Sequence, residues 1–311
     1  MIRVSTANLY LQSEQGINAD QSAMMNTQAQ LSSGKQINSP ADNPVGAAQA
    51  ALLQSDLSQL GQFRSNQAQA SQLLNNASST LTQVTNVMQS VNTTLVQAGN
   101  GALPDSGRSA LAAQLQQDLN QLVGLANTSD GQGGYLFGGS VTSSPPFVQN
   151  GNSVSYVGNN DVPSLQISQT RTEPVKYSGA AIFNDVPTGN GTYQSIFSTI
   201  ASAITALQTP NSSAAVAATN SAAITSALGS TQQAITSLSS TQASMGAQLS
   251  ELSMYGTVNS DQTLQDQTQM SSIVDLNYAT GVSQLAQQQT QYQAALQSYA
   301  AISKLSLFNY V

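Results

Sequence analysis

Apolar residues recur every seven positions over long stretches of this chain. From position 53 to position 98 two such series run three residues apart, and from 224 to 252 the apolar positions alternate steps of four and three. This is the a and d pattern of a coiled coil, in which the apolar seam of one helix faces a partner helix. The simplest interpretation is the core of an intramolecular bundle of long helices. The expected seam residues of this bundle are Leu53, Leu60, Leu74, Leu81, Met88, Leu95, Ile224, Ile235, Leu238, Met245, Leu249 and Leu252.

Both ends of the chain carry a similar heptad spacing. The two series are Tyr10, Ile17, Met24 and Leu31 near the N-terminus, and Tyr278, Val282, Leu285, Tyr292, Leu296 and Tyr299 near the C-terminus. We expect these segments to pair as a terminal coiled coil that serves assembly. Burial of an apolar side chain stabilises by about 1.5–3 kcal/mol, whereas ordering the backbone costs about 1–2 kcal/mol per residue. Because so narrow a seam is marginal, the hypothesis is that both ends order only when neighbouring molecules cover them.

Turn residues indicate where the helices begin and end. The first helix is expected over residues 5–31. Asn43 followed by Pro44 is typical of a helix start, because the Asn side chain accepts a hydrogen bond from the first turn and Pro lacks an N–H where none is needed. Glycines at 99 and 101 end this second helix near Gln97.

Later boundaries follow from the same signals. A third helix is expected to begin with Asp105 or Ser106 as its cap and to stop near Asp130. Helical pattern resumes after a segment rich in turn residues and breaks at 209–211. Apolar content becomes sparse between Gly256 and Gln269, so a joint is expected there or slightly later, before the last helix.

The segment 131–191 has a different composition from the rest of the chain. It holds ten of the 22 glycines and five of the nine prolines. Asn150-Gly151 lies between short alternating apolar runs and predicts a β-hairpin. The expected fold is mainly α, a long antiparallel helical rod with paired terminal helices and a small inserted β-rich domain. The expected domains are 1–40 with 277–311 as the terminal coiled coil, 41–134 with 192–276 as the bundle, and 135–191 as the insert.

Composition excludes several kinds of chemistry. The chain has no histidine and no cysteine, which removes Ser–His and Cys–His nucleophilic sites, the common zinc ligand sets and disulfides. Only 7% of the residues are charged and the net charge is −7, with the basic residues scattered, so nucleic acid is not an expected partner. We expect no cofactor, no metal site and no enzymatic activity.

Carboxylate pairs are the remaining candidates for chemistry. Asp261 with Asp266, or Asp130 with Asp161, lack the spacing of a calcium loop or of an acid–base pair. Asp130 precedes a glycine and is typical of a turn. A secreted enzyme or adhesin carried by residues 135–191 is an alternative of a different class, which the lack of a titratable cluster in that segment disfavours.

Membrane insertion is not expected, because the chain contains no run of about eighteen apolar residues. The N-terminal residues also lack the apolar core of a cleaved secretory signal. Residues 276–303 carry no charge. If an assembly brings copies of this helix close to one another, a charge on one copy repels the same charge on its neighbours. Compositional drift in a chain rich in Gln, Ser and Ala is the alternative explanation.

Four stretches resemble the bacterial flagellin family. They are Leu31–Ala48 (LSSGKQINSPADNPVGAA), Gln97–Gly101, Ala126–Gly139 and Ala301–Tyr310. The Pro40–Pro44 segment is similar to the hook-associated branch of the family more than to the filament flagellins, which remain the alternative. Together these motifs are specific, although each alone is weak.

The resemblance implies a structural subunit between the flagellar hook and the filament, located outside the cell. Members of the family are exported unfolded through the flagellar type III channel without signal cleavage, and both termini pair as a coiled coil that lines an inner tube. The implied partners are copies of the chain itself in a tubular ring, the hook-proximal junction protein, flagellin and an export chaperone.

Overall fold

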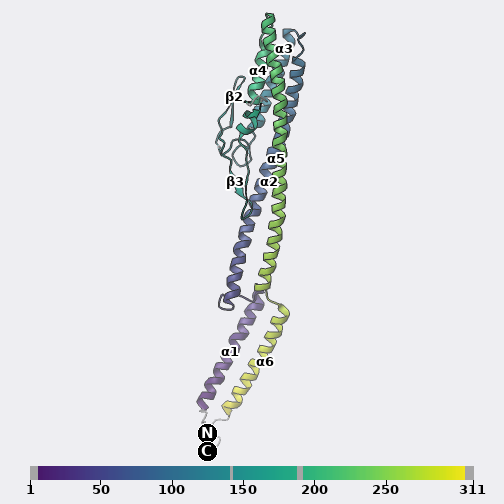
Figure 1. The fold of residues 1–311 in the computed structure, drawn as a ribbon. Coiled ribbons are helices and arrows are strands. Elements are labelled where there is room, and N and C mark those ends of the chain that lie inside the picture. Colours follow the sequence, from purple (N-terminus) through teal and green to yellow (C-terminus); the bar gives the residue numbers. More distant parts are fainter. Residues whose placement is uncertain (1–5, 141–142, 188–191, 305–311) are drawn as a thin grey trace, which may run out of the picture. The chain divides into compact units, whose positions relative to one another are not determined.

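The computed structural model describes residues 6–140, 143–187 and 192–304 of the chain. Most of these residues are helical (Figure 1), and the expectation of a mainly α fold with a small β-rich insert is confirmed. The helices are α1 (Thr6–Ser33), α2 (Pro44–Ala98), α3 (Asp105–Ala126), α4 (Ile196–Gln208), α5 (Ala214–Val274) and α6 (Tyr278–Lys304). The π-helical turn η1 spans Ala180–Asn184, and the strands are β1 (Phe147–Asn150), β2 (Ser153–Tyr156), β3 (Ser164–Gln166), β4 (Thr172–Pro174), β5 (Val186–Pro187) and β6 (Tyr193–Gln194).

The chain forms two compact units. Unit 1 comprises Met1–Leu60 and Ser260–Val311, and unit 2 comprises Gly61–Asn259. Helices α2 and α5 therefore contribute to both units. The division into 1–40 with 277–311, 41–134 with 192–276, and 135–191 stays a prediction.

In unit 2 the heptad positions of α2 and α5 supply much of the core. Leu74, Leu81, Met88 and Leu95 are fully buried on α2, one every second turn. On α5 the structure buries Ile224, Leu238, Met245 and Leu252, while Ile235 and Leu249 are partly buried against the same core. The two helices lie alongside each other, and Gln242 of α5 donates a hydrogen bond to the Thr82 hydroxyl of α2 (3.2 Å). In unit 1, Leu60 is buried and Leu53 is half-buried.

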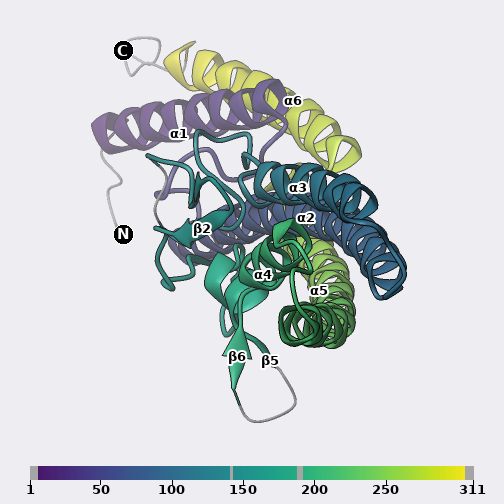
Figure 2. The same cartoon turned by 90° about the horizontal axis from the view of Figure 1, so that it is seen from above.

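Aromatic rings form the core beneath the β-rich segment of unit 2. The Phe147 ring lies 5.0 Å from that of Tyr156, 5.3 Å from Phe183 and 5.2 Å from Phe197, measured between centroids. These rings come from β1, β2, η1 and α4, so the core joins the hairpins to a helix. Among the described residues, pairs of strands form three separate hairpins, β1–β2, β3–β4 and β5–β6. Figure 2 shows β5 beside β6.

The predicted hairpin at Asn150-Gly151 exists, displaced by one residue. Asn150 pairs with Ser153, so the two turn residues are Gly151 and Asn152. Gly151 has φ of +62°, a conformation that glycine adopts without strain. The hairpin prediction is therefore right in its location and wrong in its register.

Helix boundaries partly follow the expected signals. Asn43 caps α2 as predicted, since its Oδ1 accepts from the Gly46 N–H (3.0 Å). The predicted cap of α3 is wrong, because Pro104 occupies the cap position without a side-chain hydrogen bond. Asp105 is the first helical residue, where the positive end of the helix dipole stabilises its carboxylate. Helix α3 ends at Ala126, before Asp130. Helix α5 continues unbroken to Val274, so the joint lies just beyond the apolar-poor stretch.

Candidate assembly surface

Helices α1 and α6 of unit 1 pair along their length in opposite directions (Figures 1 and 2). At one end the Tyr10 hydroxyl donates to the Ile302 carbonyl (3.2 Å), and the Tyr10 and Tyr299 rings meet edge to face with centroids 6.0 Å apart. At the other end the Leu31 side chain lies over Gly281, where an added Cβ would come within 3.1 Å of it. Segments nearly 300 residues apart in sequence thus form one helix pair.

Two non-helical joints hold the pair together at that second end. The Gln36 N–H donates to the Val274 carbonyl (2.8 Å), and the Leu276 N–H donates to the Gly34 carbonyl (2.9 Å). Between them, Lys35 and Asp275 form an antiparallel β-bridge. The joint after α1 and the joint before α6 therefore bind each other, a link that no local sequence signal predicted.

The seam between α1 and α6 is shallow. Tyr10, Ile17, Met24, Leu31, Leu285, Tyr292 and Tyr299 are all half-buried. Among the residues described in these two helices, Thr27 and Gly281 are the fully buried ones. The Gln288 Oε1 atom is buried without a hydrogen-bond partner, so part of the seam is polar and unsatisfied. Such an interior stabilises the pair far less than the core of unit 2 stabilises that unit.

Three residues predicted for the C-terminal stripe lie on the outer side of α6. Tyr278, Val282 and Leu296 are 56%, 57% and 41% exposed. The half-buried or buried positions of α6 besides Leu285, Tyr292 and Tyr299 are Gly281, Gln288, Ala295 and Ile302. The observed register differs from the predicted one: the small residues Gly281 and Ala295 lie in the seam, where they permit a close approach, and Val282 and Leu296 are exposed. The Tyr278 hydroxyl lies beside Gly34, just after α1.

The outer side of this helix pair carries several exposed apolar side chains among uncharged polar ones, and few charges. Leu9, Leu11 and Met25 of α1 are also exposed. From residue 276 to residue 303 the chain carries no charged side chain. A neighbouring molecule can cover this face of α6 without desolvating any charge, which is the largest cost of burying a protein surface.

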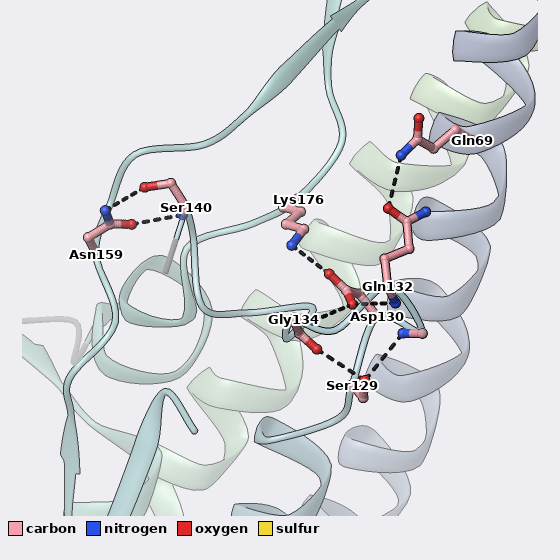
Figure 3. Close-up of polar contacts among 9 residues, drawn as sticks. Gln69, Ser129, Asp130, Gln132, Gly134, Ser140, Asn159 and Lys176 are labelled. Atoms are coloured by element: carbon pink, nitrogen blue, oxygen red, sulfur yellow. Dashed lines mark hydrogen bonds and ion pairs between the residues drawn. The ribbon is translucent and has the colours of Figure 1, made fainter. Parts of the chain in front are cut away.

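A polar cluster in unit 2 surrounds Asp130, which follows α3 (Figure 3). Its Oδ1 accepts from the N–H groups of Gln132 and Gly134 (both 2.8 Å), and its Oδ2 accepts from Lys176 Nζ (2.6 Å). Burial alone raises the pKa of this carboxyl, but the Lys176 ammonium and the two backbone N–H groups outweigh burial and lower it from its ordinary value of 3.8. Asp130 is thus a turn residue, as predicted, and also half of an ion pair that the sequence did not reveal.

Two of the four carboxylates considered for chemistry, Asp130 and Asp266, are held in structural contacts. Asp130 pairs with Lys176 rather than with Asp161, and Asp266 accepts from Gln262 Nε2 (2.8 Å). Within the described ranges no cluster of three or more acidic side chains is arranged to hold a metal ion. None of the described helices is long and apolar enough to span a membrane.

Further contacts fasten the β-rich segment to α5 within unit 2. Arg171 binds Glu251 (2.9 Å) and Glu173 (3.4 Å), and the Tyr177 hydroxyl donates to the Gln248 side chain. Burial, together with the neighbouring Glu173 carboxylate, raises the pKa of Tyr177 to about 12. Burial and the Glu251 charge also raise the pKa of Glu173.

Comparison with known proteins identifies the relatives of this chain. It is 33% identical to the flagellar hook-associated protein 3 of Salmonella typhimurium and 32% identical to that of Escherichia coli K12, over 99% of each chain in both cases. The chain belongs to the hook-associated protein 3 family. Residues 4–142 also match the bacterial flagellin N-terminal helical region.

Solved structures share the fold of this chain. The Legionella pneumophila hook-associated protein 3 has a TM-score of 0.68 at 18% identity, covering 72% of this chain and 98% of that one. Xanthomonas campestris FlgL has a TM-score of 0.63 at 19% identity, covering 70% and 98%.

The hook-associated interpretation is confirmed over the alternative of a filament flagellin. The phase 1 flagellin of Salmonella naestved is 28% identical over 130 residues, which cover 42% of this chain and 26% of the flagellin. Similarity to hook-associated protein 3 extends over nearly the whole chain, whereas similarity to this flagellin stops short of half of it.

Proposed function

We propose that this chain is a non-enzymatic structural subunit that joins the hook of the bacterial flagellum to the flagellin filament. The observation that carries the proposal is its similarity to hook-associated protein 3 over 99% of both chains. The α1–α6 pair supports it physically, because a shallow seam beside an uncharged α6 face with exposed apolar side chains is suited to burial among neighbouring subunits.

In this proposal the outer face of the terminal pair is the main assembly surface. Tyr278, Val282 and Leu296 pack against copies of the chain, together with the seam residues of α1 and α6. Each subunit contacts the next through different surfaces, a head-to-tail arrangement that generates an open tube rather than a closed dimer. Because the isolated seam is thin, we expect the pair to be fully stable only inside the tube.

The remaining partners and the cellular location belong to the same proposal. The chain contacts the hook-proximal junction protein on one side and flagellin on the other, and a chaperone accompanies it before assembly. Export proceeds through the type III channel of the flagellum without signal cleavage, so the assembled protein lies outside the cell. Residues 1–40 and 277–311 form the inner tube, and residues 135–191 form the outermost domain, held by the ion pairs and aromatic core described above.

A matched pair of valine substitutions tests the assembly surface. Val282 on α6 is 57% exposed, and Val96 on α2 in unit 2 is 58% exposed. Substituting glutamate at either position of an exposed helix face changes folding stability by about 0.5 kcal/mol or less. Val282→Glu is expected to prevent incorporation into flagella, because it repeats a charge between neighbouring subunits, and Val96→Glu is expected to permit it.

The assay is complementation of a strain that lacks this protein. We expect that strain to release its flagellin into the medium, and the wild-type chain to restore attached filaments and swimming. Restoration by Val282→Glu at the wild-type level contradicts the proposed surface. Attached filaments in the deletion strain contradict the junction function itself.

A further inference from the structure

Arg108 is a charged residue that unit 2 buries without an opposite charge. It lies in the first turns of α3 and is 5% exposed. Its Nη2 donates to the carbonyl oxygens of Ala206 (2.5 Å) and Thr209 (2.9 Å), at the C-terminal end of α4. No carboxylate of the described residues forms an ion pair with it, and its Nε is buried without an acceptor.

The end of α4 balances only part of this charge. A helix C-terminus is equivalent to about half a negative elementary charge, whereas a guanidinium always carries one full positive charge. The group has five N–H donors on three nitrogens, and both of its hydrogen bonds to protein leave from Nη2. After capping α4, Arg108 therefore still has unused N–H donors and an unbalanced positive charge in a buried position. This is unfavourable unless an anion accepts those donors and balances the charge.

A partly enclosed pocket of about 80 Å³ lies beside Arg108. The loop at 99–101 forms one wall, and Asn211, Asn220 and Ser221 form another. The Asn211 amide, the Ser221 hydroxyl and the backbone of the loop offer donors, whereas both N–H groups of the Asn220 amide already bind within the protein. The pocket lining contains no carboxylate. Since a water molecule occupies about 30 Å³ of the liquid, the pocket holds two or three waters, or one small oxyanion.

The pocket is held in shape by the protein alone. Asn220 Nδ2 donates to the Thr209 carbonyl (3.1 Å) and to Asn211 Oδ1 (2.9 Å). Arg108 binds the same Thr209 carbonyl, so the arginine and the asparagine fix one loop between them. A ligand entering the pocket therefore meets a wall that the protein has already fixed, and little ordering is required of the protein.

We propose that this pocket binds a small tetrahedral oxyanion, inorganic phosphate or sulfate, on the guanidinium of Arg108. Arginine is suited to this ligand because its planar donors match two oxygens of one anion. The bound anion links the loop at 99–101 to the loop at 209–211, the two turns that connect α2 to α3 and α4 to α5. Its effect is to stabilise unit 2 against unfolding.

The test is a phosphate titration of the full-length chain, followed by thermal unfolding at constant pH and ionic strength. Sodium chloride replaces phosphate in the reference samples. The midpoint temperature is expected to rise with phosphate and then saturate, as for a ligand that binds only the folded state, whereas the general effect of salting ions does not saturate. Arg108→Gln is expected to weaken the apparent affinity by about tenfold or more.

Arg64→Gln is the matched control, because Arg64 is an exposed arginine on α2. It is expected to retain the wild-type titration. Equal saturation in Arg108→Gln and the wild type overturns the proposal, as does a wild-type response that never saturates. A response to sodium acetate equal to that to phosphate assigns the pocket to carboxylates and also overturns it.

A second measurement needs no variant at Arg108. The chain has four arginines, so the ¹⁵N spectrum of the labelled protein holds four Nε–H signals. Phosphate is expected to shift one of them strongly, and that signal must survive in Arg3→Gln, Arg64→Gln and Arg171→Gln, which leaves Arg108 as its source. If no such signal moves at saturating phosphate, the site does not exist.

Discussion

The Lys176–Asp130 ion pair is buried, so replacing Lys176 by methionine is expected to destabilise unit 2. The two charged atoms lie 2.6 Å apart, and the side chains are 10% and 2% exposed. Loss of one partner from a buried pair costs about 3–5 kcal/mol, compared with about 0–1 kcal/mol for an exposed pair. Asp130 keeps its bonds from Gln132 and Gly134, so the lower end of the range, about 3 kcal/mol, is expected.

Urea unfolding followed by circular dichroism measures this loss. Lys35→Met is the matched control, because the Lys35 side chain is exposed and its described contacts include no ion pair. We expect the free energy of unfolding of the control to change by about 0.5 kcal/mol or less. If Lys176→Met also stays within that limit, the ion pair does not stabilise unit 2 and the reasoning from burial is refuted.

The same pair predicts an acid dependence. The pKa of Asp130 is lower in the folded chain than its ordinary value of 3.8, because the Lys176 ammonium and two N–H groups outweigh the opposing effect of burial. A lowered carboxyl pKa contributes stability that is complete above the unfolded pKa and is lost as pH falls through the folded pKa. The difference between wild type and Lys176→Met is therefore expected to be constant from about pH 5 to pH 7 and to shrink below about pH 4.

Three further substitutions test the contribution of burial, two of them in unit 2 and one in unit 1. Burial raises the pKa of Asp118 above 3.8, and the bonds from Gln114 and Ser90 only partly oppose it; the ionised form therefore destabilises the fold. We expect Asp118→Asn to stabilise unit 2 by about 1 kcal/mol at pH 7, with the gain vanishing as the pH falls toward 3.8 in urea titrations. Leu81→Ala in the core of unit 2 is expected to cost about 2–5 kcal/mol, because Leu81 is fully buried. Leu285→Ala, in the shallow α1–α6 seam, is expected to leave the unfolding transition of unit 2 unchanged and to speed proteolysis of the terminal helices. An equal loss of global stability in Leu81→Ala and Leu285→Ala contradicts the weak seam.

Local sequence determined the helices and many of their limits. Heptad spacing requires only that residues a fixed distance apart share one helix face, and this holds before any tertiary contact forms. Asn43 with Pro44 marks the start of α2 because the capping bond and the missing N–H act within one turn. The hairpin near Gly151 was likewise predictable, since its turn needs a residue that adopts positive φ.

The register of α6 was decided by packing. Leu285, Tyr292 and Tyr299 fit a seam with either Val282 and Leu296 or Gly281 and Ala295 beside them, because both sets repeat every seven residues along with the tyrosines. Apolarity favoured the first set in the sequence, but the structure places the second against α1. Small residues allow the helix backbones to approach closely, and this property becomes visible only when the partner helix is present.

No local sequence pattern predicted the contacts between residues that are far apart in the chain. Lys176 lies 46 residues from Asp130, Arg171 lies 80 residues from Glu251, and Arg108 lies about 100 residues from the carbonyls that it binds. From sequence alone a charged residue is expected at the surface, and only the folded structure shows that it is buried. The sequence by itself therefore determined which segments are helical and that their ends can pair. Only the tertiary structure decided which charges are buried and what faces them, because burial is a property of the whole fold and not of the neighbouring residues.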